Sequence, residues 1–83
     1  MCVSIYTSKD TEIDTLGQLR SLVGDDAVTF WEDCTSEIYA DRSRWDEGND
    51  WCLCQVDIDE TMKKAGYSVK WPDHRMHCDV SRM

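Results

Sequence analysis

Hydrophobic and polar positions alternate at the beginning of the chain. Val3 and Ile5 fall on one side of an extended segment, and Ser4 and Tyr6 fall on the other. A period of two residues is typical of a strand that buries one face. The pattern therefore predicts a short strand over residues 2–7.

From residue 11 the apolar spacing changes to that of a helix. Thr11 and Asp14 have the spacing of a capping box, with Asp in place of the usual Glu or Gln. Gly24 is suited to the position that follows the last helical turn. We therefore expect a helix over residues 11–23. Its buried side would consist of Ile13, Leu16, Leu19, Leu22 and Val23.

The segment after Gly24 admits two interpretations. One is a strand over residues 27–31, since Val, Thr, Phe and Trp all favour sheets. The other is a second helix, capped by Asp25 or Asp26 and running to about Arg42. We prefer the helix, because a narrow apolar stripe continues at helical spacing through the segment. The stripe consists of Ala27, Trp31, Cys34 and Ile38.

Residues 42–50 are polar and predict a loop around Gly48. The alternation that follows predicts a strand over residues 51–58. Asp59 would then cap a short helical turn through Ala65, closed by Gly66. One face of the predicted strand would consist of Cys52, Cys54, Val56 and Ile58.

Two further strands are expected near the C-terminus. The first covers residues 67–71 and places Tyr67, Val69 and Trp71 on one face. Pro72-Asp73 suits a type I turn. A last strand follows the turn, and its inward face would consist of Met76, Cys78 and Val80.

The order of these elements defines a fold class. Residues 1–83 are expected to form a single domain, because a chain of 83 residues has no room for a second core. The link between residues 58 and 67 is too short for a parallel crossover, so the strands should pair antiparallel. We expect an α+β fold in the order β-α-α-β-(short α)-β-β. Two helices would pack on one face of a small, mainly antiparallel sheet of three to four strands.

Charge is distributed unevenly along the chain. Residues 10–60 carry 15 acidic side chains and three basic ones, in a chain whose formal net charge is −8. Such a density of like charge repels itself, and a positively charged partner explains it more readily than folding does. The competing explanation is a solvated surface that only keeps the protein soluble.

Three acidic groups are candidates for the partner-binding surface. Asp33, Glu37 and Asp41 would recur about every 6 Å along the expected second helix, with Asp26 on the same side. The other two groups lie at residues 46–50 and 57–60. A row of carboxylates at this interval can take the place of phosphates in a basic groove.

The four tryptophans are assigned different roles. Trp45 and Trp51 flank the acidic residues 46–50, and tryptophan is enriched at binding hot spots. Trp45 is therefore the expected apolar anchor, whereas Trp31 and Trp71 are expected in the core. The predicted partner-binding residues are Asp26, Asp33, Glu37, Asp41, Trp45, Asp46, Glu47 and Asp50.

Cysteine and histidine residues raise a zinc hypothesis that the spacing does not favour. The weak candidate ligands are Cys52, Cys54, His74 and His77. Structural zinc sites generally use cysteines separated by two to four residues rather than one. No cofactor is therefore expected. The chain has no Gly-rich phosphate loop and no nucleophile elbow, so we expect a protein that is not an enzyme.

The same composition predicts a cytoplasmic protein. Five cysteines are an odd number, and residues 1–10 lack the pattern of a signal peptide, which together indicate reduced thiols. No run of apolar residues is long enough to cross a bilayer, and an acidic protein is repelled by anionic lipid. No membrane association is expected.

These observations favour a small acidic protein that inhibits a nucleic-acid-binding protein or complex by occupying its basic surface. In size, acidity and lack of catalytic motifs the chain resembles small phage-encoded inhibitors of bacterial defence, anti-CRISPR proteins and DNA mimics among them. The resemblance lies in composition alone. A phage-encoded protein of this kind would act in the host cytoplasm, without binding nucleic acid directly.

Two alternatives remain open from the sequence. One is an immunity or antitoxin protein that neutralises a basic nuclease toxin, and the other is a small zinc-binding adaptor. A homodimer is also compatible with an exposed tryptophan-rich face.

Overall fold

Four strands form one sheet in the order β2-β1-β4-β3, in a computed structural model that describes residues 3–7, 11–32, 37–73 and 76–83. Strands β1 and β4 pair in parallel, and the two outer pairs are antiparallel. The fold is the expected α+β class with a mainly antiparallel sheet. The strands are β1 (Ser4–Tyr6), β2 (Glu12–Ile13), β3 (Tyr67–Lys70) and β4 (His77–Arg82).

The buried face of the sheet is a continuous apolar row. Ile5 of β1 pairs with Ile13 of β2 on one side and with Cys78 of β4 on the other. Val80 of β4 pairs with Val69 of β3. The alternation read from the first strand is confirmed, because Ile5 is fully buried while its neighbours are partly exposed.

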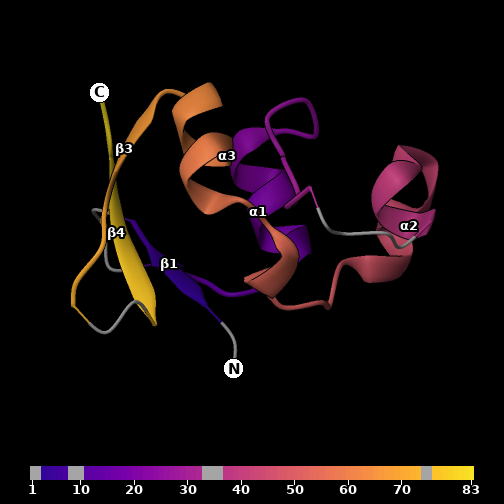
Figure 1. The fold of residues 1–83 in the computed structure, drawn as a ribbon, viewed down its shortest axis with the longest axis horizontal. Coiled ribbons are helices and arrows are strands. Elements are labelled where there is room, and N and C mark those ends of the chain that lie inside the picture. The colour runs from indigo at the N-terminus through magenta and orange to yellow at the C-terminus, as the bar shows by residue number, and fades with distance from the viewer. Residues whose placement is uncertain (1–2, 8–10, 33–36, 74–75) are drawn as a thin grey trace.

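Two helices cover this face, as Figure 1 shows, and a third lies beyond them. The two covering helices are α1 (Leu16–Val23) and α3 (Ile58–Lys64). Leu19 of α1 and Met62 of α3 are completely buried. Among the described residues, no helix has the length and apolar character needed to cross a membrane. The helices are α1 (Leu16–Val23), α2 (Glu37–Ala40) and α3 (Ile58–Lys64), with 3₁₀ turns η1 (Arg42–Gly48) and η2 (Leu53–Gln55) between α2 and α3.

Helix α1 begins later than the sequence spacing predicted. Thr15 is the N-cap, and Gln18 completes a capping box with it, so Thr11 and Asp14 do not start the helix. Residues 12 and 13 belong to β2 instead. The end of the helix is confirmed: Gly24 follows it with φ +83°, a conformation that suits glycine.

The predicted long helix from residue 25 or 26 to about 42 is wrong for residues 27–32, although α2 covers Glu37–Ala40 near its predicted end. Residues 25–27 form a turn, residues 28 and 29 have no regular secondary structure, and Phe30 forms an isolated bridge with Val56. The alternative interpretation of β-favouring residues was closer. Thr29 is held from both sides, because its N–H donates to Thr61 Oγ1 and its carbonyl accepts from the Asp57 N–H.

The predicted strand over residues 51–58 is also wrong. Residues 53–55 form η2, and Ile58 already begins α3. The Asp57 side chain accepts from the Glu60 N–H at 3.2 Å and caps the helix in place of Asp59. Leu53, assigned to the other face, is buried to 1% exposure. Alternation over so few residues did not distinguish a strand from a turn followed by a helix.

The start of α1 docks on the loop after η1. The Leu16 N–H donates to the Trp51 carbonyl at 2.8 Å, and the Gly17 N–H donates to the Asn49 carbonyl at 3.0 Å. The first amides of a helix have no partner within it, so this loop supplies their acceptors. Gly48 lies under the Trp51 ring, where an added Cβ would be 2.7 Å from a ring carbon.

We predict that G48A destabilises the protein by about 1–3 kcal/mol, because the methyl group would push the indole away from its seat. Urea unfolding followed by far-UV circular dichroism measures the change. The neighbouring variant E47A alters an exposed side chain in the same turn and should change stability much less. Equal effects of the two variants would show that the contact between Gly48 and Trp51 is not tight.

Candidate partner-binding surface

The structure describes the side chains of six of the eight predicted partner-binding residues. Asp33 lies outside the described residues, and Glu37 lies in α2, where only its backbone is described. Asp41 is the N-cap of η1, and its carboxylate accepts from the Ser43 N–H at 3.0 Å. Helix α2 ends at Ala40, so the predicted ladder of residues 33, 37 and 41 on one helix is not formed.

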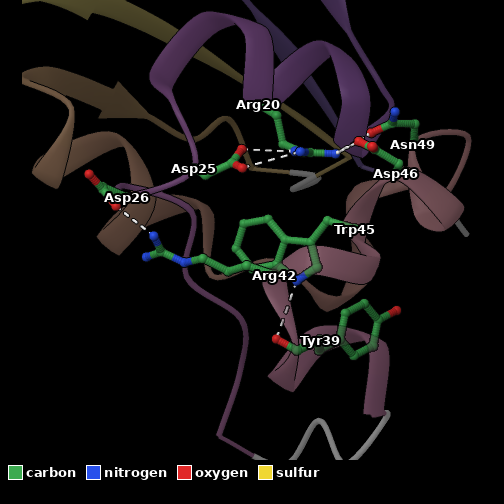
Figure 2. Close-up of polar contacts among 8 residues, drawn as sticks. All are labelled: Arg20, Asp25, Asp26, Tyr39, Arg42, Trp45, Asp46 and Asn49. Carbon is green, nitrogen blue, oxygen red and sulfur yellow. Dashed lines mark hydrogen bonds and ion pairs between the residues drawn. The ribbon is translucent and has the colours of Figure 1, made fainter.

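Three of the predicted acids, together with Asp25, are paired with the arginines of the same segment. Arg20 of α1 holds Asp25 through two hydrogen bonds of 2.8 and 3.1 Å. Its other terminal nitrogen donates to Asp46 and Asn49, at 2.9 and 2.8 Å. Figure 2 shows the guanidinium between these two sets of partners. Arg20 thereby joins α1, the turn that follows it, and η1.

Arg42 and Arg44 make simpler pairs. Arg42 reaches Asp26, and Arg44 donates to Glu47 at 3.0 Å. Asp26 is 98% exposed and Asp46 is 84% exposed, so these carboxylates still face solvent. Exposed ion pairs contribute little to stability.

Two carboxyl groups of this region have pKa values below the ordinary range. The hydrogen bonds from Arg20 lower the pKa of Asp25. The side chain and backbone of Ser43 lower the pKa of Asp41. Both groups are therefore ionised well below neutral pH, and their negative charge is a permanent feature of the folded chain.

Trp45 does not serve as an exposed anchor. It is 3% exposed and belongs to the core, which corrects its predicted role. Its indole N–H donates to the Tyr39 carbonyl at 3.4 Å (Figure 2). The guanidinium groups of Arg20 and Arg42 lie 5.7 and 5.6 Å from the ring centroid. The same two guanidinium groups pair with Asp25, Asp26 and Asp46, so these carboxylates are held near the tryptophan ring.

Trp31, which was expected in the core, is the exposed tryptophan. It is 48% exposed, and the segment that carries it is not helical. It lines a groove between η2 and α3. Beside the indole, the lining side chains with ionisable groups are Glu32, Cys54, Asp57, Glu60 and Lys64. Three carboxylates and an exposed aromatic ring thus share one concave surface, which the acidic count alone did not locate.

The zinc candidates do not assemble into a site among the described residues. Cys52 and Cys54 lie together, with their sulfurs 3.2 Å apart. His77 lies in β4 with its ring against Tyr6, and His74 is outside the described residues. In the part of the chain that the structure describes, no group of three or more metal-ligating side chains is gathered.

Comparison with protein-family models, curated proteins and solved structures finds no match for this chain.

Because Trp45 is buried and Trp31 is exposed, replacing each of them should affect stability differently. We expect W45A to destabilise the protein by about 3–5 kcal/mol, since it empties a buried site and leaves two guanidinium groups without the ring. W31A should change stability by no more than about 1 kcal/mol. Chemical unfolding of both variants measures the difference. A larger loss for W31A would mean that its side chain is part of the core after all.

Removal of the Arg20 guanidinium should lower the free energy of unfolding by an amount that depends on pH. R20M should lose about 2 kcal/mol at neutral pH, because it removes charge-assisted hydrogen bonds from the least exposed arginine of the ion pairs. Asp25 has a lowered pKa in the folded protein, so its contribution is complete above its ordinary value near 3.8 and is lost as the pH falls further. The difference between wild type and R20M should therefore shrink below about pH 4.

Unfolding curves from pH 7 to pH 2.5 test this expectation. The control is R44M, which removes an exposed arginine from its pair with Glu47 and should change stability little at any pH. A difference between wild type and R20M that stays constant down to pH 2.5 would contradict the role of Asp25.

Proposed function

We propose that this chain is a small acidic binding protein that inhibits a nucleic-acid-binding protein or complex by occupying its basic surface. The observation that carries the proposal is an excess of carboxylates that the chain does not neutralise itself. Each arginine of residues 10–60 is already held by an acidic side chain of the same segment. The excess acids have no cation of their own to pair with there.

Several described carboxylates have no ion pair. Glu32, Asp50 and Glu60 make no salt bridge with any described residue. Salt or a positively charged partner weakens the repulsion among such carboxylates. A site evolved to bind phosphates is lined with lysine and arginine. Its charge complements these carboxylates.

The groove beside Trp31 supports a specific contact in addition to the general field. An arginine from the partner could stack on the indole while its guanidinium pairs with Glu32 or Glu60. Partly desolvated contacts of this type slow dissociation, whereas the exposed acids accelerate association. Inhibition would follow from exclusion, because nucleic acid and this protein would compete for one basic surface.

We expect the unpaired acids to determine partner capture. The immobilised protein is incubated with nuclease-treated bacterial lysate at low and high salt, and the bound proteins are identified by mass spectrometry. Wild type should enrich nucleic-acid-binding proteins at low salt, and E32Q/D50N should lose about tenfold in affinity for them at equal salt. Titration of a captured protein with its nucleic acid should then show mutual competition.

The matched control is D73N/D79N, which removes the same charge outside residues 10–60 and should behave as wild type. Equal capture by all three proteins, or capture without competition against nucleic acid, would contradict the proposal. Capture of a nuclease whose gene lies beside this one would identify the antitoxin form of the same mechanism.

A further inference from the structure

Cys52 and Cys54 form a close pair of thiols. Their sulfur atoms are 3.2 Å apart, at the start and middle of the η2 turn. The turn is closed by a hydrogen bond from the Val56 N–H to the Leu53 carbonyl at 3.0 Å. Leu53 between them is buried, so the turn is anchored in the core. The backbone therefore holds the two sulfurs together, and a bond between them needs little movement.

The two thiols lie differently with respect to the grooves of the surface. Both residues are partly exposed, but Cys54 lines the groove beside Trp31 and also a smaller apolar groove toward Trp71. Cys52 lines neither of them. Cys78, in contrast, is fully buried in β4, and burial raises its pKa to about 12. A reagent that enters either groove therefore meets Cys54, and it does not reach Cys78 in the folded protein.

We infer that Cys52 and Cys54 are a dithiol that exchanges with low-molecular-weight disulfides. The thiolate of Cys54 attacks one sulfur of the small disulfide, forms a mixed disulfide and releases one small thiolate. The thiolate of Cys52 then attacks the Cys54 sulfur and displaces the second small thiolate. Two cysteine thiols become one disulfide, the small disulfide is reduced to two thiols, and the two protons pass to the released thiolates.

The charge around the groove selects between small disulfides. Glu32, Asp57 and Glu60 line the groove with Cys54, and Lys64 is the one cation among its lining residues. A negative field attracts a cationic reagent and repels an anionic one. Cystamine, which carries two ammonium groups, should therefore react faster than the anionic glutathione disulfide. High salt should reduce the difference.

Tryptic mapping tests the reaction on the full chain. Cleavage after Arg44 and Lys63 yields a peptide of residues 45–63, in which Cys52 and Cys54 are the only cysteines. After treatment with cystamine and quenching with iodoacetamide, this peptide should lose two hydrogen atoms and resist alkylation. Dithiothreitol should restore both thiols. The peptide that contains Cys78 should be unmodified unless the protein is first denatured.

Single variants test the order of attack. C52S should accumulate a stable mixed disulfide at Cys54, and C54S should form an adduct several-fold more slowly. E32Q/E60Q should bring the rates for cystamine and glutathione disulfide closer together, with an unchanged circular dichroism spectrum. Peptide 45–63 recovered with both thiols alkylated would overturn the inference. Equal adduct rates in C52S and C54S would overturn the assignment of Cys54 as the attacking thiol.

Discussion

The position of the Arg20 guanidinium is the constraint on which the acidic half of the molecule depends. Helix α1 has only eight residues, and a helix of that length is marginal without tertiary contacts. Arg20 ties its last turn to Asp25 and, across 26 residues of sequence, to Asp46. The loop bound in this way supplies the acceptors for the first amides of the same helix. Both ends of α1 and the cover over Trp45 therefore depend on one cation.

Part of the negative charge is consequently structural. Without Arg20, Asp25 and Asp46 would repel each other. Without Arg42, Asp26 would lose the cation that pairs with it. A count of acidic residues does not separate these carboxylates from those that face solvent without a cation. The structure makes the separation for the described residues: the acids paired with Arg20 and Arg42 lie around Trp45, and Glu32 and Glu60 line the groove at Trp31.

Local sequence signals predicted the parts of the fold that local interactions determine. The first strand, the strand from Tyr67, and the glycines that end α1 and α3 all follow from nearby residues. Thr15 and Gln18 also have the capping-box spacing in the sequence, and they mark the true start of α1 better than Thr11 and Asp14 do. The α+β class follows from the sum of these signals.

The described residues between 25 and 58 were less predictable. Several of them depend on partners that are distant in sequence: Thr29 on Thr61, Phe30 on Val56, and Asp46 on Arg20. An apolar period over a few residues cannot represent such contacts, so the predicted helix at residues 27–32 and the predicted strand at residues 51–58 were wrong. The two tryptophan assignments failed with them, because burial of Trp31 was argued from the helix and exposure of Trp45 from its acidic neighbours.

The backbone connects the groove at Trp31 to the pair of thiols at Cys52 and Cys54. The Trp31 N–H donates to the Gln55 carbonyl at 3.0 Å, at the end of the turn that carries Cys52 and Cys54. Phe30, the preceding residue, is bridged to Val56 just after that turn. Backbone bonds therefore attach the segment of the exposed indole to the same turn that carries the two thiols. A change in the conformation of η2 should therefore alter the groove, because Trp31 is hydrogen-bonded directly to Gln55 of this turn.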